Sequence, residues 1–430
     1  MRTQPNLASR IANAAIVVLT FALFLTVQTP SMQAQTYSVI HNFLGGPDGD
    51  EPAYGMAIDA HGILYGSTFE GDEGTGTIFR VRHVSSGWQL TTLYIFTGGS
   101  DGAVPYGGAI VGPNGSLYGT TAYGGLGPCV TWGGKTGCGT VFNMQPPTSS
   151  CKTALCYWGE SVLNLFTGPN GATPYGGQPI FDSAGNLYGT TYSGGSSTNC
   201  TGGCGLVWKL TRSGNSWSQQ VLYTFTGTAG DGAFPWAGVV FDVAGNLYGT
   251  TEFGGAYGYG TVYELSPNGS GWSEKIVYSF QDGQDGGEPY AGVILDHSGN
   301  LYGATTIGGS GAGGTVFELS PAGSNWNFQT LHAFTRQAGE LAGGPVANLA
   351  MDSAGNLYGA TGGDGAYGFG SVFKMTLSTG NWTLNSLYDF TGGNDGRLPR
   401  SNLVIDSSGN LYGTAAGGQL GHGVVYEITQ

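Results

Sequence analysis

The tripeptide Leu-Tyr-Gly occurs seven times in this chain of 430 residues, and its regular spacing constrains the fold more than any other feature. Successive copies are separated by 53, 70, 60, 54, 56 and 54 residues. A period near 50 residues that contains several short apolar runs is typical of repeat architectures such as propellers. The copies begin at Leu64, Leu117, Leu187, Leu247, Leu301, Leu357 and Leu411.

The fourth repeat shows the unit most clearly. Its apolar and alternating runs predict strands over residues 236–242, 247–251, 261–265 and 272–280. A tight Val-Ala-Gly-Asn turn connects the first strand to the second, and a Gly-rich loop connects the second to the third. A Ser-Pro-Asn-Gly-Ser-Gly turn connects the third strand to the fourth. Four short strands without helical periodicity predict one antiparallel propeller blade per repeat.

The two ends of the repeat region predict a closed ring. The seventh unit ends with its third strand, at residues 424–428, and a run resembling the missing fourth strand lies at residues 37–43. Pairing these two runs covers an exposed sheet edge. We therefore expect an all-β, seven-bladed propeller with four-stranded blades, closed by the N-terminal strand. A β-helix and a kelch-like ring of another blade number are the alternatives.

Residues 1–35 have the pattern of a signal peptide. Arg2 and Arg10 precede an uncharged apolar stretch at 14–27, and Pro30, Ser31 and Ala34 follow as a cleavage region. An uncleaved N-terminal anchor is the alternative. We expect residues 36–430 to form a single domain, in a protein that is secreted or periplasmic and has no membrane contact after cleavage.

The charge balance excludes some partners. The chain has 13 Lys and Arg against 27 Asp and Glu, a formal net charge of −14, and no basic run. Nucleic acid and anionic membranes are therefore poor partners. We expect a monomer without cofactor or metal.

All six cysteines lie in the second and third repeats. An even number behind an export signal predicts disulfides, although six cysteines allow 15 pairings. Proximity favours the three local pairs Cys129–Cys138, Cys151–Cys156 and Cys200–Cys204. Zinc is the alternative, but the chain lacks a Cys-x-x-Cys motif.

The unit Asp-x-x-Gly-Asn-Leu-Tyr-Gly-Thr-Thr, followed by Gly-Gly and Gly-Thr-Val-Phe, resembles the GloVer tandem repeat. That repeat belongs to the "choice-of-anchor" group of exported bacterial proteins. The resemblance covers residues 37–430 and implies export, while the family carries no activity to transfer. The turn aspartate recurs at Asp59, Asp182, Asp242, Asp296, Asp352 and Asp406. We expect it to cap its own turn rather than to bind calcium.

Propeller topology places the Gly-rich loops and the Asp-Gly-x-x-Pro crossovers between blades on one face. Aromatic side chains among small polar residues can stack on sugars or hold a peptide, although packing over the loop backbone is equally compatible. The candidate ligand-binding residues are Trp132, Tyr123, Tyr192, Phe253, Tyr257, Tyr259, Tyr367, Phe369, Asp101, Asp231, Asp285 and Asp395. For the crossover aspartates, turn chemistry favours turn formation over ligand binding. The recurring tryptophans are expected to pack between blades: Trp88, Trp158, Trp217, Trp272, Trp326 and Trp382.

The sequence contains no His-Glu-x-x-His or Gly-x-Ser-x-Gly motif. We therefore expect a secreted, non-catalytic propeller that binds a polysaccharide or an extracellular protein through the loop face. The alternative is an extracellular hydrolase or lyase that acts on glycans with carboxylates at a central pocket, where Glu252, Glu288 and Asp364 are candidates.

Overall fold

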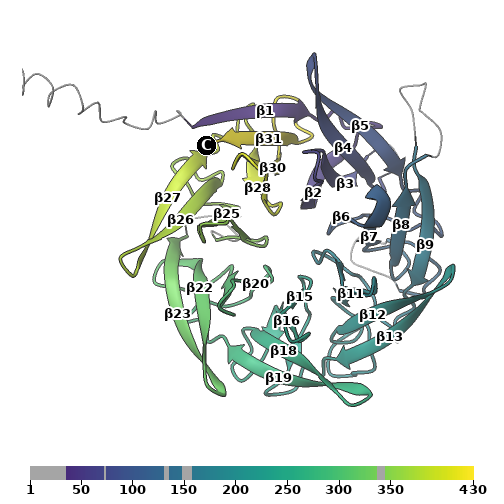
Figure 1. The fold of residues 1–430 in the computed structure, drawn as a ribbon, viewed down its shortest axis with the longest axis vertical. Coiled ribbons are helices and arrows are strands. Elements are labelled where there is room, and N and C mark those ends of the chain that lie inside the picture. The colour runs from purple at the N-terminus through teal and green to yellow at the C-terminus, as the bar shows by residue number, and fades with distance from the viewer. Residues whose placement is uncertain (1–34, 72–73, 130–134, 148–156, 337–343) are drawn as a thin grey trace, which may run out of the picture.

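The computed structural model describes residues 35–71, 74–129, 135–147, 157–336 and 344–430. Seven small antiparallel sheets are arranged in a ring, as a seven-bladed β-propeller (Figure 1). The only helical segment among these residues is the short 3-10 helix η1 (Pro113–Gly115). The predicted signal peptide lies outside the described residues, apart from Gln35. No helix in the described ranges is long and apolar enough to cross a membrane.

In blades 1 to 6 the four strands follow one another in sequence from the axis outward, whereas the outermost strand of blade 7 is the N-terminal strand of the chain. Blades 1 and 2 contain β2 (Asp50–Ile58), β3 (Leu64–Glu70), β4 (Thr77–Val84) and β5 (Gly87–Ile95), then β6 (Ala109–Val111), β7 (Leu117–Thr121), β8 (Thr140–Gln145) and β9 (Gly159–Leu165). Blades 3 and 4 contain β10 (Ile180–Phe181), β11 (Leu187–Thr191), β12 (Leu206–Ser213) and β13 (Ser216–Thr224), then β15 (Val240–Phe241), β16 (Leu247–Thr251), β18 (Thr261–Asn268) and β19 (Gly271–Ser279).

Blades 5 and 6 contain β20 (Ile294–Leu295), β21 (Leu301–Ala304), β22 (Ala312–Ala322) and β23 (Asn325–Thr335), then β24 (Ala350–Met351), β25 (Leu357–Thr361), β26 (Ser371–Ser378) and β27 (Asn381–Asp389). Blade 7 contains β29 (Val404–Ile405), β30 (Leu411–Ala416), β31 (Val424–Thr429) and β1 (Thr36–Asn42). Two further short pairings involve β14 (Gly232–Ala233) with β17 (Phe253–Gly254), and β28 (Arg397–Pro399) with β30.

The N-terminal strand closes the ring. β1 pairs antiparallel with β31, with Thr36 opposite Thr429 and Val39 opposite Tyr426, so the purple and yellow ends of the chain share blade 7 (Figure 1). The ring of Tyr37 stacks on that of Tyr388 in blade 6 at a centroid distance of 3.8 Å. The predicted closure is confirmed.

The innermost strand of blade 4 is shorter than the sequence predicts. The sequence predicts a strand over 236–242. This predicted length is wrong, because only Val240 and Phe241 pair with β16. The preceding Pro235 lacks an N–H, and Gly238 lies against the backbone carbonyl of Gln178 in blade 3. The outer strands β18 and β19 are correspondingly longer, so the turn between them shrinks to residues 268–271.

The repeated Leu-Tyr-Gly motif has a packing role at each of its three positions. The leucine is fully buried, and the tyrosine packs against the recurring tryptophan of the next blade, as Tyr65 does with Trp158 at 6.3 Å. The glycine lies beneath an aromatic ring of the third strand. A Cβ at Gly303 would lie 2.5 Å from Phe317 Cζ, so only glycine fits there without displacing the ring.

The Asp-x-x-Gly-Asn turns are structural, as expected. Asp182 Oδ1 accepts hydrogen bonds from the N–H groups of Ala184 (2.9 Å) and Asn186 (2.8 Å). Its Oδ2 accepts from Asn186 Nδ2 (2.7 Å) and from the Tyr188 hydroxyl of Leu-Tyr-Gly (2.9 Å). The same pattern recurs in four other turns, at Asp242, Asp296, Asp352 and Asp406.

Candidate functional site

The Gly-rich loops and the crossovers lie on the same face, because hydrogen bonds join them in the same way in six blades. The residue before the crossover proline donates its N–H to a carbonyl at the end of the Gly-rich loop. Examples are Val104 to Thr75 (2.7 Å), Phe234 to Cys204 (2.8 Å) and Glu288 to Tyr259 (2.8 Å). The predicted face is therefore correct.

The same residues have a positive φ, which non-glycine residues rarely adopt. The values range from 48° to 60°, at Glu51, Val104, Thr173, Phe234, Glu288 and Leu398. A conformation of this kind costs on the order of 1 kcal/mol and persists where the surroundings hold it in place. Here the hydrogen bond to the loop holds it. In blades 2 to 5 this turn is followed by a proline and then by an aromatic residue.

These aromatic residues meet around the propeller axis. Tyr54 stacks on Tyr106 with ring centroids 4.8 Å apart, and Trp236 stacks on Tyr175 at 4.8 Å and on Tyr290 at 5.1 Å. Tyr106 and Tyr175 contact edge to face at 5.6 Å. The result is one continuous aromatic cluster contributed by five blades.

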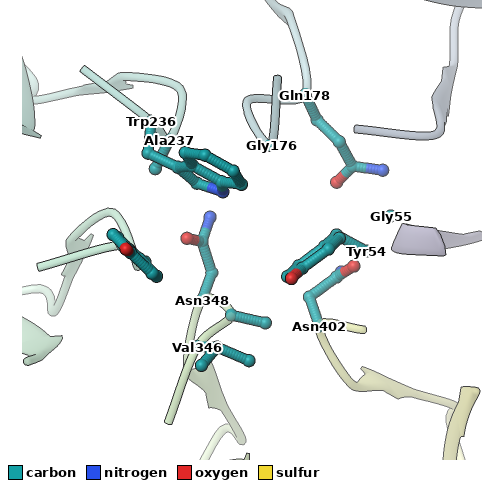
Figure 2. A pocket seen from close by; sticks show the side chains of 11 residues that line it. Tyr54, Gly55, Gly176, Gln178, Trp236, Ala237, Val346, Asn348 and Asn402 are labelled. Carbon is teal, nitrogen blue, oxygen red and sulfur yellow. The ribbon is translucent and has the colours of Figure 1, made fainter. Parts of the chain in front are cut away.

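Side-chain amides link the blades beside this cluster. Asn402 Oδ1 accepts the Met56 N–H (2.7 Å), Asn348 Oδ1 accepts the Gly292 N–H (2.7 Å), and Gln178 Nε2 donates to the Ala109 carbonyl (3.2 Å). Figure 2 shows Gln178, Asn348 and Asn402 converging from three segments beside Tyr54 and Trp236.

The axial cavity at this point has a volume of about 20 Å³. A space of this size holds about one water molecule and is too small for a sugar. The residues that line it are Tyr54, Gly55, Gly176, Gln178, Trp236, Ala237, Tyr290, Val346, Ala347, Asn348 and Asn402. Within the described chain, no carboxylate lines this cavity, so its chemistry differs from that of the central pocket expected for a glycan-active enzyme.

A much larger groove of about 690 Å³ lies beside the axis, over blades 1 to 4. Its floor is aromatic, and neighbouring rings touch in sequence: Phe69 with Tyr106 at 5.3 Å, and Tyr192 with Phe234 at 5.0 Å and Trp236 at 5.5 Å. Small polar residues complete its walls. The full lining is Phe69, Tyr106, Tyr123, Cys129, Ala172, Thr173, Tyr175, Tyr192, Ser193, Thr201, Gly202, Phe234 and Trp236.

The structure brings together only some of the predicted aromatic residues. Tyr123 and Tyr192 line the groove, and the Tyr123 hydroxyl lies 2.8 Å from that of Tyr175. Phe253 packs edge to face on Phe234 at 6.1 Å, outside the groove lining. Four others project into solvent from the loops of blades 4 and 6, with 37% to 61% of their surface exposed: Tyr257, Tyr259, Tyr367 and Phe369. Trp132 lies outside the described residues, and its role stays a prediction.

The crossover aspartates accept hydrogen bonds from their own turns. Asp101 accepts from the Thr97 N–H (2.8 Å) and hydroxyl (2.6 Å), and Asp231 accepts from the Thr226 N–H (2.7 Å). Asp285 and Asp395 are bonded in the same way. These contacts agree with the favoured interpretation of turn formation, and a role in ligand binding stays a prediction.

Two predicted disulfides are confirmed, Cys129–Cys138 and Cys200–Cys204. Each lies within a Gly-rich loop that borders the groove, since Cys129, Thr201 and Gly202 belong to the groove wall. The third pair, Cys151 and Cys156, lies outside the described residues. No free cysteine and no cluster of three metal-ligating side chains occurs in the described ranges.

Of the three candidate carboxylates, Glu252 has the surroundings most typical of a functional residue. It follows β16 at the edge of the aromatic cluster and is only 4% exposed. Burial raises the pKa of Glu252 to about 7; interactions with the hydroxyls of Tyr192 and Tyr290 oppose this shift, and the charge of Glu288 adds to it. The other two carboxylate candidates are less enclosed: Glu288 is partly buried, also with a raised pKa because of burial, and Asp364 lies in the loop of blade 6.

Sequence reasoning missed the residues at the centre of the aromatic cluster around the axis. Tyr106, Tyr175, Trp236 and Tyr290 follow the crossover proline in four successive repeats, and this recurring Pro-aromatic pair was the available signal. The equivalent residues of blades 6 and 7 are Val346 and Arg400. The aromatic floor is therefore confined to one side of the ring.

Fold and site together define a disulfide-containing seven-bladed propeller with an aromatic groove on its loop face. The chain belongs to the Gloeobacter/Verrucomicrobia repeat family, whose model matches residues 26–201, 128–344 and 275–430. This result confirms the resemblance seen in the repeat motif. No curated protein matches the chain.

Solved structures with a similar fold include a putative 6-phosphogluconolactonase from Bacteroides fragilis NCTC 9343. It is 15% identical, with a TM-score of 0.51, over 82% of this chain and 87% of that protein. A putative 6-phosphogluconolactonase from Bacteroides uniformis ATCC 8492 is also 15% identical, with a TM-score of 0.48, over 81% and 86% of the two chains. At 15% identity, the likeness to the Bacteroides fragilis protein shows the propeller fold alone.

Proposed function

We propose that this protein is an exported, non-catalytic propeller that binds a polysaccharide chain in the aromatic groove. The observation that carries the proposal is the groove floor, where rings from four blades touch one another. Aromatic rings present apolar faces that match the C–H faces of sugars. Hydroxyl groups of Thr173, Ser193 and Thr201 beside the rings offer hydrogen bonds to sugar hydroxyls.

The charge of the protein favours a neutral polysaccharide. The net charge is −14, and a polyanionic chain would be repelled at low ionic strength. The groove lining contains no ionisable carboxylate, lysine or arginine within the described residues. Recognition would therefore rest on stacking and on neutral hydrogen bonds.

We also propose that the protein is exported to a secreted or periplasmic location. The signal-peptide pattern over 1–35 supports export, and the two disulfides are compatible with an oxidising compartment. We expect the exported protein to act as a monomer without a cofactor.

A glycan array of neutral polysaccharides, followed by titration calorimetry with the best ligand, tests this function. Tyr192→Ala should weaken binding by roughly 1–3 kcal/mol, the scale of losing an aromatic contact. Tyr367→Ala is the matched control, because Tyr367 is also an aromatic residue of a Gly-rich loop but is 61% exposed on blade 6. Equal effects of the two changes would contradict a binding site in the groove. No binding to any glycan would overturn the polysaccharide proposal and leave an extracellular protein as the ligand class.

A second candidate is a glycan-active hydrolase or lyase. Glu252 favours it, because a carboxyl group with a pKa of about 7 can donate or accept a proton at neutral pH. Glu288, whose charge acts on Glu252, would be the second carboxylate. A reducing-end assay on the same glycan panel separates the two candidates: release of products from a bound polysaccharide would refute the non-catalytic function.

A further inference from the structure

The second repeat lacks the turn aspartate that the other six repeats share. Gly112 stands at the position of Asp182, and the turn that follows is the 3-10 helix η1. In the other six repeats, this aspartate accepts a hydrogen bond from the tyrosine hydroxyl of Leu-Tyr-Gly at 2.9 to 3.4 Å. Tyr118 has no carboxylate at this place, and its hydroxyl makes no hydrogen bond to another described residue. The turn of the second repeat therefore supplies no acceptor for a hydroxyl that has one in the other six.

Neighbouring rings fix the position of Tyr118. Its side chain is buried and contacts Phe181 edge to face at 4.9 Å and Trp217 at 6.5 Å. A Cβ at Gly112 would lie 2.5 Å from Tyr118 Cε2, so the ring covers the place where the aspartate side chain would begin. An acceptor for the Tyr118 hydroxyl thus has to come from outside this turn.

The next blade places an arginine at the same interface. Arg212 pairs with Trp217 across β12 and β13. The residues paired with the recurring tryptophan in four other blades are His83, Pro267, Pro321 and Leu377. Arg212 donates its Nε–H to the Gly214 carbonyl (3.0 Å), and no ion pair joins it to an acidic side chain of the described residues. A permanent positive charge with free N–H donors therefore lies where the carboxylate is missing.

Two adjoining cavities lie between blades 2 and 3 at this interface. Their volumes are about 200 and 270 Å³, and Tyr118, Gln145, Arg212 and Trp217 line both of them. Neutral polar side chains complete the walls, including Asn143, Ser161 and Asn215 in the smaller cavity and Ser116 in the larger. Sites for drug-sized ligands usually measure about 300–1,000 Å³, so each of these spaces suits a smaller molecule.

The cavities lie toward the face opposite the aromatic groove. Pro113 and Asn114 of η1 line the larger cavity, and β7 leads from η1 to the Gly-rich loop of blade 2 (Figure 1). The turn and the Gly-rich loop are therefore at opposite ends of this strand. A ligand bound between the blades would not contact the groove, so this site is independent of the proposed function.

We propose that this interblade pocket binds the carboxylate group of a small organic acid, which supplies to Tyr118 and Arg212 the acceptor that the turn aspartate supplies in the other repeats. The planar guanidinium group of arginine matches a carboxylate in a bidentate arrangement. Burial raises the pKa of Tyr118, and the charge of Arg212 opposes this rise, so the hydroxyl stays protonated and can donate at neutral pH.

The other walls favour a sugar acid as the source of the carboxylate. Trp217 offers an apolar ring that suits the C–H face of a sugar. Gln145, Ser161 and Asn215 add neutral groups for hydrogen bonds to sugar hydroxyls. The chain has a net charge of −14, but salt screens charges over about 8 Å at physiological ionic strength, so the adjacent Arg212 dominates the interaction with an anion.

The test is calorimetric titration of the whole protein at pH 7 and physiological ionic strength, with D-glucuronate, acetate, D-glucose and inorganic phosphate as separate probes. We expect the wild type to bind D-glucuronate and acetate but not D-glucose. Tyr118→Phe and Arg212→Gln should each weaken D-glucuronate binding about tenfold or more, the effect of losing a hydrogen bond to a charged group.

Two matched variants control for the loss of a hydroxyl or a charge elsewhere. The Tyr358 hydroxyl donates to Asp352 (3.0 Å) in blade 6, and Arg82 donates to Gln89 (3.2 Å) on the outer strands of blade 1. Tyr358→Phe and Arg82→Gln should bind D-glucuronate as the wild type does. Tyr192→Ala, which alters the groove, should also leave this affinity unchanged.

The probes also identify the kind of acid. Tighter binding of D-glucuronate than of acetate indicates a sugar acid, and equal binding indicates a simpler carboxylic acid; both results support the carboxylate site. Three results would overturn it: no binding of either carboxylate, binding of phosphate as tight as that of the carboxylates, or a D-glucuronate affinity that is unchanged in Tyr118→Phe or Arg212→Gln. Loss of D-glucuronate binding in Tyr192→Ala would also overturn it, because the acid would then bind in the groove.

Discussion

The glycine of Leu-Tyr-Gly offers a sharp test of how the blades are packed. Gly303 pairs directly with Phe317 across β21 and β22, and a Cβ at Gly303 would lie 2.5 Å from Phe317 Cζ. The ring of Phe317 is fully buried, so it cannot move into solvent. We expect Gly303→Ala to lower the free energy of unfolding by about 1–3 kcal/mol, the usual cost of overpacking a core.

Gly159 provides the control for the intrinsic effect of alanine. It lies in β9, and no atom of the described residues is within 4 Å of an added Cβ. Neither glycine has a positive φ, so alanine introduces no backbone strain at either position. Gly159→Ala should therefore leave stability unchanged or slightly higher, because alanine reduces the entropy of the unfolded chain. Urea unfolding followed by tryptophan fluorescence gives both values.

A second substitution, at Phe317, tests whether the contact between the new methyl group and the Phe317 ring causes the loss of stability. Phe317→Leu shortens the side chain that meets the new methyl group, so the double variant should be more stable than the sum of the two single effects predicts. We expect a coupling energy above about 1 kcal/mol, within the range seen for residues in contact. Additive effects, or a Gly303→Ala variant as stable as Gly159→Ala, would refute the argument that ring packing requires glycine here.

Three further predictions follow from the ring, the carboxylates and the disulfides. Deleting β1 (Thr36–Asn42) should expose the edge of β31 and cause aggregation, measured by light scattering; a deletion variant with wild-type solubility and melting temperature would rule out the closure. Burial, and secondarily the charge of Asp231, raise the pKa of Glu274 from 4.5 to about 7. The stability contributed by protonated Glu274 is therefore complete below pH 4.5 and is lost as the pH rises through 7. Glu274→Gln should thus be more stable than the wild type at pH 8, on the order of 1 kcal/mol after solvent screening, and equal stabilities would contradict the pKa shift. Mass spectrometry without reductant should find all six cysteines in local disulfides, and mild reduction should weaken glycan binding before the propeller unfolds, because the loops of Cys129–Cys138 and Cys200–Cys204 border the groove.

The candidate site was predictable only in part. Tyr123 and Tyr192 could be selected because aromatic residues in Gly-rich loops share a face, and both line the groove. The same reasoning selected Tyr257 and Tyr367, which project into solvent. Loop position determines the face of the propeller, but it does not determine whether a side chain turns toward the axis or away from it.

The most central residues of the site depend on neighbours from other blades. Trp236 is enclosed by Tyr175 of the preceding crossover and Tyr290 of the following one, each more than 50 residues away in the chain. Glu252 acquires its burial and its raised pKa from the same assembly. Neither property leaves a trace in the local sequence, where Glu252 resembles any other polar loop residue.

The sequence by itself determined the repeat number, the strand order within a blade, the ring closure, the capped turns and two of the local disulfides. These features follow from short-range periodicity and turn chemistry, which a chain carries in the order of its residues. Only the tertiary structure decided that the axis is nearly filled, that the inner strands of blades 2 to 7 are short, and that the aromatic groove lies over blades 1 to 4. The physical reason is that closing the ring brings equivalent positions of different blades within contact distance, and the properties of a site at the axis come from those contacts.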